Sequence, residues 1–144
     1  MTRTKRIQRI VALADVSRHA ASQHLARSRK AHDENAARLE QFRLYHAEYA
    51  KALGTGGSGM SAAAARELRR FLTQIERTIA VLEQQLRLSA EQCNVDVRTW
   101  QQAARRSDAL GGILDTATSA AAQLDEGRLQ REIDDRGVRR GGDD

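Results

Sequence analysis

The chain has 144 residues with a formal net charge of +5, and 30% of its residues are charged. Only 3% are aromatic, which argues against an ordinary globular core, whereas 40% apolar residues with much alanine are typical of long helices and coiled coils. Cys93 is the only cysteine, so we expect no disulfide within the chain. The basic N-terminus lacks the apolar stretch of a signal peptide, and no run reaches the ~20 apolar residues of a membrane span. We therefore expect a soluble, cytoplasmic protein.

The first predicted element is a helix over residues 3–53, which carries one apolar stripe. Its members recur every four and three residues, the spacing that keeps one helix face against a partner helix. Polar residues interrupt this stripe, so we expect it to be the weaker half of a pair. The apolar members are Ile7, Val11, Ala14, Ala21, Leu25, Leu39, Phe42, Tyr49 and Leu53, and the polar members are Arg18, Ser28, His32, Asn35 and His46.

A glycine-rich turn is predicted over residues 54–60, in a chain that contains no proline. Gly54 suits the left-handed residue that ends a helix, and Ser58 or Ser61 is a candidate cap for the next one. Such a break lets one helix fold back on the other. The alternative is a flexible linker between two helices that pair with other chains.

The second predicted helix covers residues 61–135, and the tail from residue 136 to 144 is expected to be disordered. The helix carries a heptad stripe with one slip of phase near Ala90. We therefore predict an all-α fold, two long helices in an antiparallel coiled-coil hairpin, as a single domain over residues 1–144. The stripe consists of Leu68, Leu72, Ile75, Ile79, Leu82 and Leu86, then Cys93, Val97, Trp100, Ala104, Gly111, Leu114 and Ala121.

The hairpin also implies a register between the two helices. A turn centred near residue 57 places Trp100 opposite Ala14 and Phe42 opposite Leu72. Large side chains then meet small ones along much of the half that holds the chain ends, as close packing requires.

Catalysis, metals and cofactors are not expected. A two-helix coil has no concave pocket of the kind that small-molecule sites occupy. His19 and His24 are five residues apart and so lie on different helix faces, not at the spacing of four that places two ligands together. Cys93 falls in the apolar seam, where a buried thiol is inert, and the glycine-rich turn lacks the Lys-Ser or Lys-Thr of a phosphate loop.

Basic residues gather at the N-terminal end. Residues 1–30 contain eight Lys or Arg and one acid, Asp15. Non-specific binding of nucleic-acid phosphates is therefore an alternative function. The segment has no aromatic residue to stack on bases, so we favour a protein partner and no nucleic acid. The candidate docking residues of this end are Arg3, Lys5, Arg6 and Arg9.

A second candidate surface lies near the turn, where four of the five aromatic residues cluster. Heptad positions place Tyr45 and Phe71 at g, and the g rows of an antiparallel pair share one edge. Four apolar residues of this region, Phe42, Tyr49, Ile75 and Leu82, could belong to the core, and packing in the seam accounts for about half of them. It does not account for Tyr45 or Phe71. Tyr and Arg are favoured at binding hot spots, so we predict a docking ridge. It comprises Arg38, Phe42, Tyr45, Tyr49, Phe71, Ile75, Thr78 and Leu82.

Four segments resemble one known family. They are "ARLEQFRLYHAEYAKAL", "RRFLTQIERTIAVLEQQL", "VRTWQQAARRSDAL" and "EGRLQREIDDRGVRR", in this order over nearly the whole chain. Together with the single turn and the aromatics beside it, they resemble the FliJ family of flagellar type III export proteins. The stalk protein of virulence secretion systems is a related alternative.

The resemblance implies an antiparallel coiled coil similar to the stalk of the rotary ATPase gamma subunit. It implies three partners, namely the hexameric export ATPase, the cytoplasmic domain of the membrane export gate and export chaperones. The expected location is the cytoplasm, peripheral to the inner membrane through these partners. The family's gate-binding surface maps onto the docking ridge, although Arg38, Thr78 and Leu82 depart from the usual residue types. The basic end would enter the ATPase ring.

Overall fold

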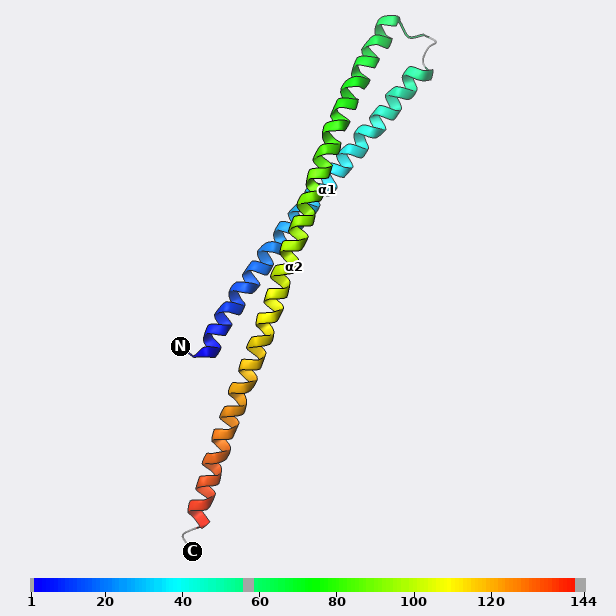
Figure 1. Cartoon of the computed structure of the whole chain (residues 1–144). Coiled ribbons are helices and arrows are strands. Elements are labelled where there is room, and N and C mark those ends of the chain that lie inside the picture. Colours follow the sequence, from blue (N-terminus) through cyan, green and yellow to red (C-terminus); the bar gives the residue numbers. More distant parts are fainter. Residues whose placement is uncertain (1, 56–58, 142–144) are drawn as a thin grey trace. The chain divides into compact units, whose positions relative to one another are not determined.

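The chain forms a hairpin of two long helices. The computed structural model describes residues 2–55 and 59–141, and within these ranges it contains two α-helices and no strand. Helix α1 spans Arg3–Thr55 and helix α2 spans Ala62–Gly141, and the two pack against each other in opposite directions (Figure 1). The predicted antiparallel hairpin is confirmed.

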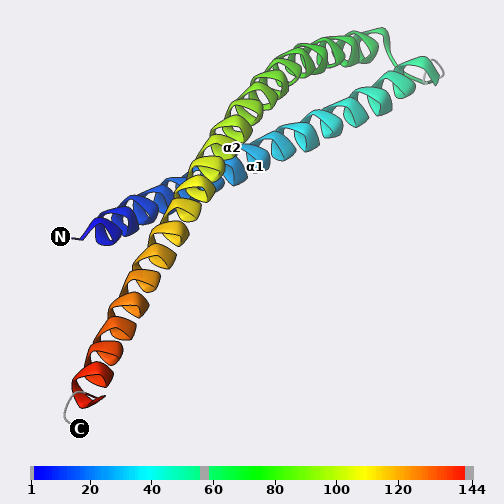
Figure 2. The same cartoon turned by 60° about the horizontal axis from the view of Figure 1, so that its bottom comes forward.

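The two helices divide into two compact units. Unit 1 contains Met1–Ala20 and Gln101–Asp144, and unit 2 contains Ala21–Trp100. In each unit a stretch of α1 lies alongside a stretch of α2, as Figures 1 and 2 both show. Unit 2 includes the turn, and unit 1 includes both ends of the chain.

Helix α2 extends further than the sequence predicts. It continues through Gly141, so the prediction of a disordered tail from residue 136 is wrong for residues 136–141, while 142–144 lie outside the described residues. Arg139 and Arg140 occupy the last turn. Their positive charges face the negative end of the helix dipole, which stabilises a helix terminus.

Hydroxyl side chains cap both helices. The backbone N–H of Lys5 donates to Thr2 Oγ1 at 3.4 Å, and that of Ala64 donates to Ser61 Oγ at 3.1 Å. Each bond satisfies one of the amides that have no partner in the first turn of a helix. Ser61 is therefore confirmed as a cap, whereas Ser58 lies outside the described residues.

Among the residues that the structure describes, the glycine with a positive φ is not the predicted one. Gly54 remains inside α1, and Gly59 has the positive φ of 105°. A residue with a Cβ is strained in that conformation, so glycine is suited to position 59.

The core of unit 2 follows the predicted stripes. Its seven-residue repeat places apolar side chains of α1 against those of α2, and polar seam residues such as His32 and His46 are half-buried. Burying one leucine contributes roughly 1.5–3 kcal/mol, so these few side chains supply most of the attraction between the helices. The buried apolar residues of unit 2 are Ala21, Leu25, Leu39, Leu72, Ile75 and Leu82.

Near Ala90, where the slip is predicted, neighbouring residues of α2 share the seam. Ser89 and Ala90 are both half-buried, and so are Asp96 and Val97. Ser28 of α1 donates a hydrogen bond to the Asp96 carboxylate across the pair. The predicted polar seam residue Ser28 thus has a polar partner on α2.

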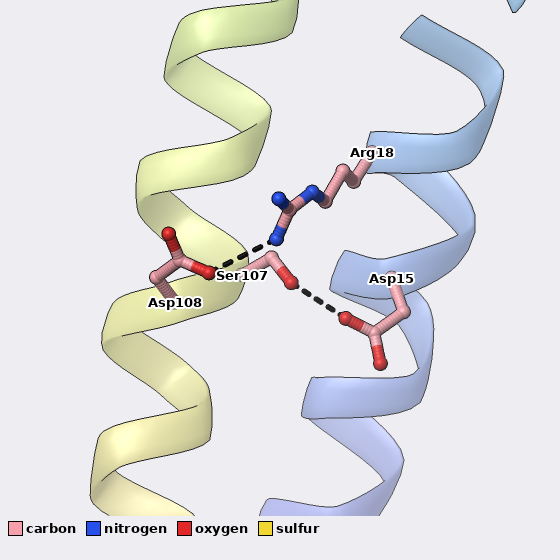
Figure 3. Close-up of polar contacts among 4 residues, drawn as sticks. All are labelled: Asp15, Arg18, Ser107 and Asp108. Carbon is pink, nitrogen blue, oxygen red and sulfur yellow. Dashed lines mark hydrogen bonds and ion pairs between the residues drawn. The ribbon is translucent and has the colours of Figure 1, made fainter. Parts of the chain in front are cut away.

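Unit 1 is held by a small buried alanine and a polar cluster. Ala14 and Ser107 are 6% and 5% exposed. Ser107 Oγ donates to Asp15 Oδ1 at 2.5 Å, and Arg18 Nη1 donates to Asp108 Oδ1 at 2.9 Å (Figure 3). Both bonds join α1 to α2. The predicted stripe ends earlier than expected on α2, because Ala121 is exposed.

The register between the helices differs from the prediction. A turn centred near residue 57 would place Asp15 opposite Thr99, but Asp15 bonds Ser107, eight residues further along α2. In unit 2, His46 Nε2 lies 3.0 Å from Glu76 Oε1, also eight residues beyond its predicted neighbour. The other polar bonds between the helices show larger displacements: Ser28 bonds Asp96, ten residues beyond its predicted neighbour, and Arg43 pairs with Glu83, twelve residues beyond. The helices are therefore displaced by eight to twelve residues from the predicted register.

Candidate docking surfaces

An apolar groove of about 340 Å³ lies beside the seam in unit 2, and we name it the tip groove. Residues of α1 form one wall and residues of α2 form the other, because the g rows of both helices share this edge. The lining residues are Phe42, Tyr45, Tyr49, Phe71, Gln74, Ile75 and Thr78.

Two pairs of rings in edge-to-face contact shape the tip groove. Phe42 and Tyr45 have ring centroids 5.9 Å apart at 75°, and Tyr49 and Phe71 have centroids 5.0 Å apart at 89°. Such pairs contribute about 0.5–1.5 kcal/mol beyond area burial, so they orient the rings. Tyr45 and Tyr49 remain 39% exposed and Phe71 remains 44% exposed, which leaves apolar surface for a partner.

The hydroxyl oxygen of Tyr45 accepts a hydrogen bond from a neighbouring side chain. Gln41 Nε2 donates to Tyr45 Oη at 2.7 Å, one helical turn away on α1. The hydroxyl proton remains to be donated to an incoming group. The tip groove therefore combines an apolar surface with one positioned donor, the arrangement that favours a specific protein contact.

The structure brings together six of the eight residues predicted for the docking ridge. Arg38 is exposed but does not line the groove, and Leu82 is 4% exposed, which places it in the core. Ile75 is also 4% exposed and forms the floor. Gln74 was missed by the sequence analysis. Its position three residues after Phe71 was the available signal, because the c row lies next to the g row on a heptad wheel.

An ion pair and a contact between histidine and glutamate lie on the opposite edge of unit 2. Arg43 Nη2 is 3.3 Å from Glu83 Oε1, and His46 Nε2 is 3.0 Å from Glu76 Oε1. These partly exposed pairs contribute little stability, typically 0–1 kcal/mol. They show that the two edges of unit 2 differ in chemistry, one charged and one apolar.

A second apolar groove, of about 550 Å³, lies in unit 1, and we name it the basal groove. Arg3 and Ile7 contribute from α1, and Leu124 of α2 is 67% exposed at its rim. Most of the α2 residues that line the groove are small. The lining residues are Arg3, Thr4, Ile7, Ala109, Gly112, Ile113, Thr116, Ala117, Ala120, Ala121 and Leu124.

The four predicted basic residues surround this end of α1. Arg3, Lys5, Arg6 and Arg9 are all exposed, and within the described parts of the chain none of them forms an ion pair. The first turn of α1 contains no acid, so the positive end of the helix dipole adds to their charge. This surface suits a partner that carries acidic side chains around an apolar projection.

The described residues offer no site for a metal and no membrane span. No group of three or more His, Cys, Asp or Glu is placed to hold a metal ion within residues 2–55 and 59–141. No helix of the described chain is long and apolar enough to cross a membrane. Cys93 is free and half-buried in the seam.

Comparison with known families adds the decisive observation. The chain matches the family described as flagellar FliJ protein over residues 4–142, which is nearly its whole length. The chain belongs to the FliJ family. FliJ proteins are non-enzymatic components of the flagellar export apparatus, and this chain is therefore such a component. No curated protein and no solved structure gives a significant match.

Proposed function

We propose that this FliJ-family chain is the stalk that links the export ATPase hexamer to the membrane export gate and that it also handles export chaperones. It would work in the cytoplasm, peripheral to the inner membrane through its partners alone. The observation that carries the proposal is the pair of unlike grooves, one aromatic and one surrounded by unpaired cations. Two different surfaces on one helical hairpin are what a linking protein requires.

The tip groove is the proposed contact with the cytoplasmic domain of the gate. Edge-to-face contacts orient its four rings, and three of them, Tyr45, Tyr49 and Phe71, are still more than a third exposed, so a partner gains apolar burial without ordering them first. Gln74 joins the predicted set because it lines the same groove, and Arg38, which is exposed but does not line the groove, remains a proposed gate contact. Leu82 is proposed to support the groove from the core instead of touching the gate.

The basic end of unit 1 is the proposed contact with the ATPase ring. Unpaired cations accelerate the encounter with an acidic surface, while the basal groove supplies the apolar contact that follows. Arg3 belongs to both, because it is basic and lines the groove. The assignment of export chaperones as partners rests on family resemblance.

A bridging experiment tests this function. The gate's cytoplasmic domain is immobilised and the purified ATPase is added with or without this chain. We expect the ATPase to be retained only when the chain is present. The stalk role is contradicted if the immobilised gate domain retains neither the chain nor the ATPase. It is also contradicted if the gate domain retains the ATPase when the chain is absent.

Random duplex DNA serves as the competing ligand in the same experiment. If DNA displaces both proteins at equal concentration and binds more tightly than either, the alternative of a basic coiled coil that binds nucleic acid is supported instead. Binding that depends on phosphates falls steeply as salt is raised, so the titration is run at two salt concentrations.

A further inference from the structure

One face of α2 within unit 2, away from the charged edge, has an unusual composition. Seven of its residues are spaced alternately by three and four positions, which places them along one side of the helix. None is charged, although 30% of the chain is. We name this face the uncharged strip, and it consists of Thr78, Val81, Gln85, Leu88, Gln92, Val95 and Thr99.

Three large aliphatic side chains stand along the strip. Val81, Leu88 and Val95 are 56%, 53% and 52% exposed. They are seven residues apart, or roughly 10 Å by helix rise. The outer positions of a coiled-coil helix usually carry charges that keep it in solvent. A regular aliphatic row without charges is therefore a candidate contact surface.

The strip reads the same in both directions. In the order Thr, Val, Gln, Leu, Gln, Val, Thr, its central residue is Leu88. Two copies of α2 that cross this face in opposite directions would place Leu88 against Leu88, and Val81 against Val95 of the other copy. A twofold interface requires such self-complementarity, because each contact occurs twice with the partners exchanged.

We propose that the uncharged strip binds the same strip of a second copy of this chain, antiparallel and with its twofold axis at Leu88. This inference goes beyond the stalk role and does not depend on it. Two of the four polar members of the strip, the threonines, fit such burial. Thr78 Oγ1 donates to the Gln74 carbonyl at 3.0 Å, and Thr99 Oγ1 donates to the Val95 carbonyl at 3.1 Å. Both hydroxyl protons thus form hydrogen bonds within the helix, and these bonds are kept when a partner covers the side chains.

The size of the strip sets the strength of the pairing. A standard interface uses about 20–30 residues on each side, so a strip of seven is in the range of weak, transient contacts. We expect a dissociation constant on the order of 100 μM. At the margin, Arg77 would come level with Arg98 of the other copy. Salt screens this like-charge repulsion, so pairing should strengthen as salt is raised.

The first test is sedimentation equilibrium of the isolated full chain from about 10 μM to 1 mM. We expect dimer to form with rising concentration. Leu88→Arg should weaken dimerisation at least tenfold, since it places two like charges at the axis. The matched control is Leu44→Arg, because Leu44 is 57% exposed on α1, outside the strip, and should leave dimerisation unchanged. Circular dichroism confirms that both variants keep their helices.

The second test fixes the direction of pairing. Combining Val81→Glu with Val95→Lys places opposite charges together in the antiparallel dimer, so this variant should dimerise better than one with Val81→Lys and Val95→Lys. A parallel dimer predicts no such advantage, because each charge would meet its own kind. The comparison uses two double substitutions at the same positions, so a general effect of altering the strip cancels.

Three results would overturn the proposal. They are a monomer at 1 mM, a dimer that tolerates Leu88→Arg, and a charge-swapped variant that dimerises no better than its like-charged counterpart. If the chain is monomeric and Leu88→Arg instead weakens capture of the ATPase or the gate domain, the strip is covered by that partner and not by a second copy.

Discussion

Ser107 of α2, which is 5% exposed, donates a hydrogen bond of 2.5 Å to the carboxylate of Asp15 on α1. The same part of unit 1 contains the bond from Arg18 to Asp108 (Figure 3). Both are polar contacts within or beside a seam that packs mainly small apolar residues. Polar residues at seam positions cost stability but select one register among those that the apolar pattern permits.

The bond between Ser107 and Asp15 should appear as a coupling free energy. Ser107→Ala alone should lower the free energy of unfolding only slightly, because alanine regains about 0.5 kcal/mol of helix propensity. In a double-mutant cycle with Asp15→Ala, we expect a coupling of about 1 kcal/mol, measured by urea unfolding. A coupling near zero would mean that the bond adds no net stability.

Gly112 lies in the middle of α2, where alanine is preferred. A Cβ added at this position meets nothing within 4 Å. Gly112→Ala should therefore raise the free energy of unfolding by about 0.5–1 kcal/mol, since glycine is the more flexible residue in the unfolded chain. Gly127→Ala, also free of contacts, is the matched control outside the basal groove.

Gly59 should respond in the opposite direction. Its φ of 105° disfavours any side chain, although no atom lies within 4 Å of an added Cβ. We expect Gly59→Ala to lower the free energy of unfolding by about 1 kcal/mol or more through backbone strain alone. Equal thermal melts for Gly59→Ala and the native chain would show that the turn relaxes to another conformation.

The exposed rings of the tip groove should matter more for docking than for folding. Replacing Tyr45 and Phe71 by alanine should cost well below the ~3–5 kcal/mol of removing a buried core ring, because both rings are partly exposed. If they are anchors for the gate, each loss should weaken gate binding by about thirtyfold. Titration of the gate's cytoplasmic domain measures this effect, and a thermal melt of the same variant measures stability.

Leu44→Ala is the control for the ring variants, because it removes an exposed side chain next to Tyr45 that does not line the groove. It should leave gate binding unchanged. ATPase binding should survive the loss of Tyr45 and Phe71, since the proposed ATPase contact is in unit 1. If the double variant binds the gate as strongly as the native chain does, both rings serve packing and not docking.

Reversing the charge of the basic end should slow association with the ATPase. Changing Arg3, Lys5, Arg6 and Arg9 to glutamate should weaken binding most at low salt, because exposed charges are screened beyond about 10 Å at 0.1 M salt. Changing Arg29 and Lys30, basic residues of unit 2, provides a control for general loss of positive charge. A chain that begins at Val11 and still stimulates the ATPase fully would exclude this end as the contact.

The sequence alone determined the hairpin and much of its surface. Apolar residues repeating every three and four positions specify which side of each helix is covered, and the long glycine-rich break specifies where the chain reverses. These are local properties, so the periodicity by itself correctly places Leu25, Leu39 and Leu72 in the core. The same periodicity places Tyr45 and Phe71 on one edge, and the tip groove confirms that they meet there.

Only the tertiary structure decided how far one helix is displaced along the other. A heptad pattern repeats along both helices, so several registers bury stripe residues of both helices and differ little in apolar contact. Specific polar pairs distinguish them, among them Asp15 with Ser107 and His46 with Glu76. Such pairs join residues far apart in sequence and depend on the final orientation of both helices.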